Sequence, residues 1–85
     1  MTASSVIKYK RKEVGITQTE AARLIRIPQS YLSWAENGYV SSVPWHAWEK
    51  IAKFYGIKIE TLSYWLTRVG YRETRLKTIE MADEQ

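Results

Sequence analysis

Glycine and proline divide this chain into short segments, and their spacing constrains the fold more than any other feature. Four glycines each follow a segment of helical periodicity, and the end of a helix favours glycine in a left-handed conformation. Two prolines stand where the next segment begins, and proline is tolerated in the first turn of a helix. These residues are Gly15, Gly38, Gly56, Gly70, Pro28 and Pro44. Because no Asn-Gly or Asp-Gly turn joins two alternating strands, we predict an all-α fold.

The segments between these residues predict five helices, at about residues 5–14, 18–25, 28–37, 44–55 and 59–69. A further helix is expected at about 72–81. Thr17 precedes the second helix and Glu20 follows three residues later, which is the pattern of a capping box. We therefore expect one domain over residues 1–69 and a C-terminal extension over 70–85, helical and then a disordered acidic end.

Apolar residues recur at three- and four-residue steps in these segments, so each helix is expected to turn one face toward a common core. The expected inward residues of the second and third helices are Ala21, Ala22, Ile25, Leu32 and Ala35. In the other helices the residues expected to share one face are Ile7, Arg11 and Val14; Trp45, Trp48, Ala52 and Tyr55; and Leu62, Trp65, Leu66 and Val69. The aromatic residues of the fourth segment are interpreted as core, because large apolar residues at helical spacing usually pack together.

Charge and composition limit the classes of function. Residues 1–58 contain nine Lys/Arg and four acidic residues, whereas residues 59–85 contain four basic and five acidic ones. The basic part favours a polyanionic partner, although a solvated surface explains this mild charge equally well. With no cysteine and one histidine, His46, the chain is expected to hold neither a disulfide nor a metal ion. No apolar run predicts a signal peptide or a membrane span, and we expect a cytoplasmic protein.

Residues 18–37 form two short predicted helices joined by a tight turn. Ala22 provides the small residue that a close helix crossing requires, and the middle of each helix is free of proline. Apolar residues fall where both helices would contact the core: Ala21, Ile25, Ile27, Leu32 and Ala35. The pattern therefore predicts a helix-turn-helix unit.

Three stretches of the sequence carry motifs of one known family: RKEVGITQTEAA at residues 11–22, PQSYLSWAENG at residues 28–38 and KIAKFYGIKIETL at residues 50–62. They resemble the Cro/XRE-type helix-turn-helix family of lambdoid phage repressors. The first resembles the start of its domain, the second its recognition helix, and the third its fourth helix and the start of its fifth. The resemblance covers roughly residues 6–66. It implies a compact five-helix repressor-like DNA-binding domain, whose third helix enters the major groove of double-stranded DNA.

The resemblance also implies roles for individual residues. Gln29 is the first choice for base readout, because a glutamine amide can donate to and accept from adenine. Gln18 is expected to contact phosphate and to brace the recognition helix, while Arg11 and Glu36 are expected to form a structural ion pair. Further candidates for DNA contact are Ser30, Tyr31, Ser33, Trp34, Lys10, Asn37, Tyr39, Ser41 and Ser42.

Two residues depart from the family pattern. Arg26 stands where the turn usually has glycine, so it is expected to adopt a positive φ. Trp34 stands on a face that is usually polar or basic. It could contact a thymine methyl group, anchor a protein partner, or turn inward with a rotated helix.

The favoured function is a sequence-specific transcription regulator, a repressor of a phage or mobile element, that acts as a homodimer without a cofactor. Leu62, Trp65, Val69, Leu76 and Ile79 follow a spacing that could form a dimer seam or a cap on the core. The alternative is a protein-interaction module on the same fold, such as an antirepressor, a regulator partner or an antitoxin. An enzyme is not expected, because His46 has no partner at a telling spacing and no glycine-rich phosphate loop is present.

Overall fold

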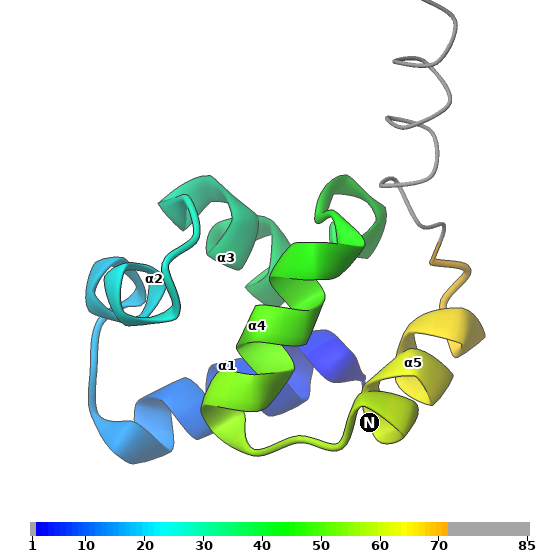
Figure 1. Ribbon diagram of the computed structural model, residues 1–85, viewed down its shortest axis with the longest axis horizontal. Helices are drawn as coiled ribbons and strands as arrows, with labels where there is room; N and C mark the ends of the chain where they lie inside the picture. Colours follow the sequence, from blue (N-terminus) through cyan, green and yellow to red (C-terminus); the bar gives the residue numbers. More distant parts are fainter. Residues whose placement is uncertain (1, 72–85) are drawn as a thin grey trace, which may run out of the picture.

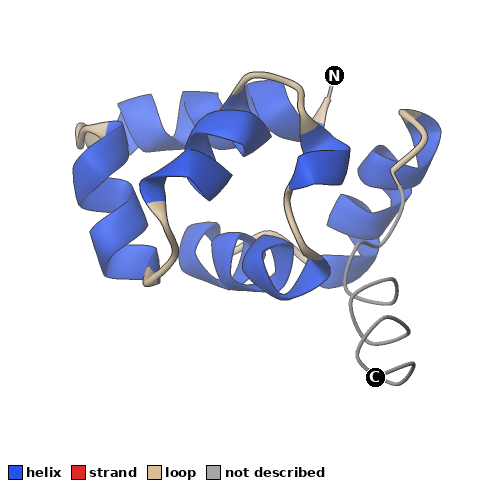
Figure 2. Ribbon diagram, turned by 90° about the horizontal axis from the view of Figure 1, so that it is seen from above, coloured by secondary structure: helices blue, strands red, loops and turns tan. Residues whose placement is uncertain are grey.

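The computed structural model describes residues 2–71 as a set of α-helices with no strand among them (Figures 1 and 2). The elements are α1 (Ala3–Val14), α2 (Gln18–Ile25), α3 (Gln29–Glu36), the 3-10 turn η1 (Val40–Ser42), α4 (Trp45–Tyr55) and α5 (Ile59–Arg68). The all-α fold with five helices, expected from the sequence, is therefore confirmed. The helix expected at 72–81, with Leu76 and Ile79, lies outside the described residues.

Helix boundaries follow local capping chemistry. Pro28 and Pro44 are the N-cap residues of α3 and α4, with ψ angles of 143° and 154°, so each helix begins one residue later than predicted. Helix α1 begins two residues earlier than predicted. Its N-cap is Thr2, whose hydroxyl oxygen accepts a hydrogen bond from the backbone N–H of Ser5 at 3.1 Å.

Helix α4 lies at the centre of the molecule, and α2 and α5 lie toward opposite ends of its long axis (Figure 1). Helices α2 and α3 lie together at one end, joined by a short turn. This arrangement leaves one side of α3 exposed while its other side packs on α1 and α2.

The core forms where the apolar stripes of all five helices meet. Trp48 is completely buried, and its indole Nε1 donates a hydrogen bond to the backbone oxygen of Val40 at 3.2 Å. Burying large side chains of this kind contributes roughly 2 kcal/mol each to the stability of the fold. The other fully or nearly fully buried apolar residues include Ile7, Ala21, Ala22, Ile25, Leu32, Ala35, Val43, Ile51, Ala52, Leu62 and Leu66.

Two residues of the predicted apolar faces are exposed. Val14 is 60% exposed at the last position of α1, and Val69 is 49% exposed just after α5. Both lie where a helix ends before Gly15 and Gly70, so the apolar stripe no longer faces the core there. Leu62 is fully buried and is not available to a second chain, which removes it from the expected dimer seam.

Candidate nucleic-acid interface

The turn between α2 and α3 sets the position of the exposed helix α3. Arg26 ends α2 with φ 69° and ψ 51°. This is the left-handed conformation expected for a residue that stands where the family usually has glycine. Its backbone N–H donates to the oxygen of Ala22 at 2.8 Å, and the N–H of Ile27 donates to the same oxygen at 3.1 Å. These two bonds close the helix end tightly, so that α3 starts after only Ile27 and Pro28.

The other end of α2 has the capping box predicted from Thr17 and Glu20. The N–H of Glu20 donates to Thr17 Oγ1 at 3.1 Å, and the N–H of Thr17 donates to Glu20 Oε1 at 2.9 Å. The bond from the Thr17 backbone lowers the pKa of Glu20 below its ordinary value. The carboxylate is therefore charged near neutral pH, where it also suits the positive end of the helix dipole.

Arg11 and Glu36 form an ion pair between α1 and the end of α3. Arg11 Nε lies 2.7 Å from Glu36 Oε2, and Arg11 Nη2 donates to Glu36 Oε1 at 3.0 Å. The remaining guanidinium nitrogen, Nη1, donates to the backbone oxygen of Ile16 at 2.9 Å. The Glu36 side chain is only 1% exposed. The hydrogen bonds that Arg11 donates to Glu36 raise the pKa of Arg11 above its ordinary value, against the lowering effect of burial.

A chain of hydrogen bonds runs from this ion pair to the start of α3. Gln18 Nε2 donates to Glu36 Oε1 at 3.2 Å, and Gln29 Nε2 donates to Gln18 Oε1 at 3.1 Å. The first residue of α2 thus holds the first residue of α3. The Gln29 amide uses one of its two N–H donors in this bond and keeps a second donor and its carbonyl oxygen.

The exposed side of α3 is polar at its start and aromatic further on. Gln29, Ser30 and Trp34 are exposed, whereas Tyr31 and Ser33 are half-buried. Trp34 is 37% exposed and its ring centroid lies 5.8 Å from that of Tyr31. The inward-turned position considered for Trp34 is therefore wrong, because the residues that face the core from α3 are Leu32 and Ala35.

Asn37 and Ser33 are joined at the end of α3. Asn37 Nδ2 donates to the Ser33 backbone oxygen at 2.8 Å and to Ser33 Oγ at 3.3 Å. The Ser33 carbonyl also accepts the backbone N–H of Asn37 at 3.0 Å, so the side-chain amide adds a second hydrogen bond to the oxygen that closes the helix. The Ser33 hydroxyl accepts one bond here and can still donate its own proton.

The remaining candidates lie away from the Gln18–Gln29 pair. Tyr39 is 64% exposed just after α3, and Ser41 and Ser42 are exposed in η1. Lys10 borders a groove between α1 and α4, together with Glu13, Val14, Phe54 and Tyr55. The structure thus joins Gln18 with Gln29 and Ser33 with Asn37 in two hydrogen-bonded pairs, and Lys10 belongs to neither pair.

The sequence did not indicate that the Tyr55 hydroxyl is buried close to the Arg11–Glu36 ion pair. Its hydroxyl is buried and has no hydrogen-bond partner among the described residues. Burial raises the pKa of Tyr55 above its ordinary value, the negative charge of Glu36 raises it further, and Arg11 opposes both. Its sequence pattern predicted only that Tyr55 faces inward, which gives no information about the ion pair beside it.

Metal ligands and membrane spans are the other features to consider in the part of the chain that the structure describes. Within residues 2–71, no three His, Asp or Glu side chains gather as metal ligands. None of the helices over the same range has the length and apolar character needed to cross a lipid bilayer.

Comparison with known proteins tests whether the chain belongs to the family that its sequence resembles. A family model described as Helix-turn-helix matches residues 7–62, which is more than half of the chain. The chain belongs to the Cro/XRE-type helix-turn-helix family. The matched range contains α2, α3 and the whole hydrogen-bond chain from Arg11 to Gln29. Searches among curated proteins and among solved structures each found no match. Family membership supports a DNA-binding regulator in general, and the family is a regulatory rather than an enzymatic one.

Proposed function

We propose that this helix-turn-helix protein is a sequence-specific regulator, a repressor of a phage or mobile element, that inserts α3 into the major groove of double-stranded DNA. The observation that carries the proposal is the hydrogen-bond chain from Glu36 through Gln18 to Gln29. It orders an exposed amide at the start of an exposed helix, where a flexible side chain would otherwise lose conformational entropy on binding.

Gln29 has the groups needed to read adenine. Adenine presents an acceptor, N7, and a donor, the N6 amino group, in the major groove. The Gln29 amide retains one N–H and its carbonyl oxygen after bonding Gln18, so it can form both bonds to one adenine. Ser30 and Ser33 lie near enough along α3 to contact a base or a phosphate.

Phosphate contacts are assigned to the surroundings of α3, because α3 itself contains no Lys or Arg. Gln18 lies at the first turn of α2, where unpaired backbone N–H groups and the helix dipole favour a phosphate. Lys10, Asn37 and Tyr39 are proposed as further backbone contacts. Contacts of this kind hold the protein in register but do not read sequence.

The test is selection of bound sequences from a random pool of double-stranded DNA. The unmodified protein is expected to enrich a defined site, and Gln29→Ala is expected to relax the preference at one base pair by about 5- to 150-fold. Ser63→Ala, an exposed serine on α5, is the matched control and should leave the selected site unchanged. If no sequence is enriched at moderate salt, the regulator proposal fails.

A homodimer is part of the proposal, since relatives bind two-fold symmetric sites. The exposed apolar residues are Ile59 and Tyr64 on α5 and Val69 just after it, whereas Leu62 is buried. Light scattering is expected to give twice the mass of the chain, free or on DNA. A monomer mass in both conditions would contradict this part of the proposal while leaving DNA binding intact.

A protein-interaction module is the second candidate, and the exposed ring pair on α3 favours it. Trp34 and Tyr31 present apolar area on the same helix as Gln29, and exposed tryptophan commonly anchors protein interfaces. Trp34→Ala in the same selection distinguishes the two. A changed sequence preference assigns Trp34 to a base contact, such as a thymine methyl group, whereas an unchanged preference assigns it to a partner.

A further inference from the structure

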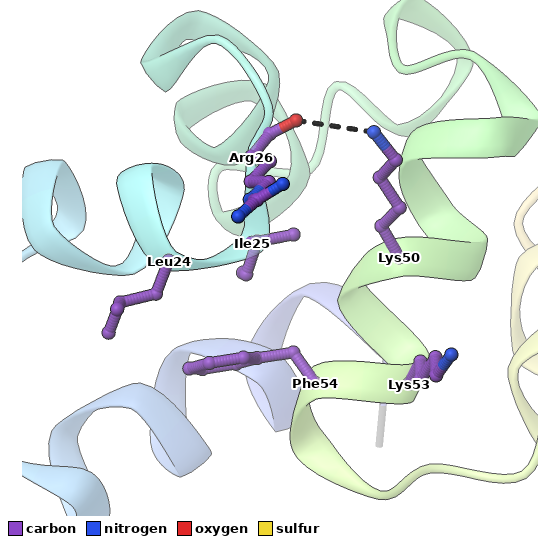
Figure 3. Close-up of a pocket in the computed structure, with 6 residues that line it drawn as sticks. All are labelled: Leu24, Ile25, Arg26, Lys50, Lys53 and Phe54. Atoms are coloured by element: carbon purple, nitrogen blue, oxygen red, sulfur yellow. Dashed lines mark hydrogen bonds between the residues drawn. The ribbon is translucent and has the colours of Figure 1, made fainter.

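A groove between α2 and α4 combines an apolar floor with a basic rim (Figure 3). Its lining residues are Leu24, Ile25, Arg26, Lys50, Lys53 and Phe54. None of them belongs to the DNA-contacting set, so the groove is a separate surface.

The floor exposes large apolar side chains from different helices. Leu24 is 60% exposed and Phe54 38% exposed, and the Phe54 ring extends toward α2 below Ile25 (Figure 3). Val14, at 60% exposed, lines the neighbouring groove that Phe54 also borders. Apolar side chains gathered in this way mark an interaction site more often than single exposed ones do.

The rim carries three cations and no acidic residue. Lys50 Nζ donates to the backbone oxygen of Arg26 at 3.3 Å, which draws this lysine toward the turn after α2 (Figure 3). The Arg26 side chain and Lys53 complete the rim. An occupant should therefore combine apolar residues with negative charge.

The chain contains one segment of that composition beyond the described residues. Residues 76–84 include three acidic residues, Glu80, Asp83 and Glu84, against one basic residue, Lys77, and their apolar residues are Leu76, Ile79 and Met81. We propose that the apolar and acidic segment 76–84 of the same chain docks in the groove, with its apolar residues against Leu24 and Phe54 and its carboxylates near the rim.

The connection is long enough to allow this. Tyr71 is held near the start of α4, because its hydroxyl donates to the Val43 backbone oxygen at 3.0 Å. Phe54 lies nine residues beyond Trp45, or about 14 Å along α4. Nine residues from Arg72 to Glu80 can span up to about 30 Å, enough to pass along and around a helix about 10 Å wide.

The test places a spin label at the end of the full chain. Because the sequence has no cysteine, Gln85→Cys gives a unique site for a nitroxide, whose unpaired electron broadens the NMR signals of nearby amides. Docking predicts selective loss of the Leu24 and Phe54 amide signals. Raising the salt to about 1 M, where charges are screened beyond about 3 Å, should restore much of their intensity.

Charge variants test the rim. Lys53→Glu in the labelled chain should restore the Leu24 and Phe54 signals, whereas Lys58→Glu makes the same charge change away from the groove and should not. Equal broadening in both variants would contradict the charge pairing. Broadening that is absent, or that falls on the groove of Thr2, Tyr64 and Arg68 instead, would overturn the proposal.

A mixed sample identifies the source of the segment. Isotope-labelled chain without nitroxide is combined with unlabelled chain that carries it. Docking within one chain predicts no broadening in this mixture. Broadening of Leu24 and Phe54 there would show a second copy as the occupant and would overturn docking within the chain.

Discussion

At the scale of single residues, the orientation of Gln29 depends on a series of side chains that leads from the surface to a buried ion pair. Gln29 is held by Gln18, Gln18 by Glu36, and Glu36 by Arg11. Only the ion pair is buried enough to resist competition from water, since Glu36 is 1% exposed and Arg11 14% exposed at their side chains. The pair therefore links the stability of the fold to the position of the proposed base-reading group.

Glu36→Ala is expected to lower the free energy of unfolding by about 3 kcal/mol, because it leaves a partly buried guanidinium without its counter-charge. Chemical denaturation followed by tryptophan fluorescence measures this change. The control is Glu13→Ala, an exposed acidic residue of α1, the helix that contains Arg11, and it should alter stability by less than about 0.5 kcal/mol. Equal effects of the two substitutions would show that the ion pair does not contribute to the free energy of unfolding beyond what an exposed acidic residue does.

Tyr55→Phe is expected to raise the free energy of unfolding by about 1 kcal/mol at neutral pH, since it removes a buried hydroxyl without a partner among the described residues. The raised pKa of Tyr55 adds a pH dependence. A group whose pKa is higher in the folded than in the unfolded state stabilises the fold at pH values below its unfolded pKa. This contribution to stability is lost as the pH rises through the folded pKa. The advantage of Tyr55→Phe should therefore widen above about pH 10.

Denaturation at pH 7 and pH 10.5 compares the two proteins. Tyr9→Phe, which removes a hydroxyl from a side chain that is 65% exposed, serves as the control and should change stability little at either pH. A loss of stability in Tyr55→Phe at neutral pH would indicate that its hydroxyl makes a favourable contact.

At the scale of helices, the sequence predicted most of what the structure contains. The Thr17–Glu20 box placed the start of α2 correctly, because capping is a local property of a few neighbouring residues. The apolar faces predicted for α1 and α5 extend too far, to the exposed Val14 and Val69, because the periodicity of a sequence does not show where the core ends. The pairing of Gln29 with Gln18 was suggested by the family resemblance alone, and no periodicity could indicate the groove between α2 and α4.

Arg26 at the turn offers a test at this scale. Arg26→Gly is expected to raise the free energy of unfolding by about 0.5 kcal/mol, because a left-handed conformation costs a residue with a Cβ roughly 1 kcal/mol, and the greater freedom of glycine in the unfolded chain offsets part of the gain. Glycine keeps the backbone oxygen that Lys50 binds.

The matched control is Arg23→Gly, three residues earlier in the interior of α2, which should lower stability by about 1 kcal/mol. Thermal unfolding of both variants gives the two signs directly. If Arg26→Gly destabilises the protein as much as Arg23→Gly does, the arginine side chain stabilises the turn by more than its strained φ costs.

At the scale of the whole molecule, the distribution of charge limits how strongly DNA binding can depend on salt. The excess of basic residues lies in residues 1–58, yet α3 carries none of them, and three line the groove between α2 and α4. Few cations therefore remain beside α3 to meet phosphates. We expect the logarithm of the association constant to fall with the logarithm of salt with a slope shallower than about −5, which corresponds to fewer than about six neutralised phosphates.

Fluorescence anisotropy on the selected DNA site, between about 50 and 200 mM salt, measures this slope. Lys10→Ala should make it shallower by about one if Lys10 contacts a phosphate, whereas Lys58→Ala, at the start of α5, should leave it unchanged. A slope of zero would contradict phosphate binding altogether, because the release of condensed counterions must accompany it. A slope steeper than about −6 would mean that cations from other surfaces, including the groove, also reach the DNA. Docking of segment 76–84 on the groove would then compete with DNA binding.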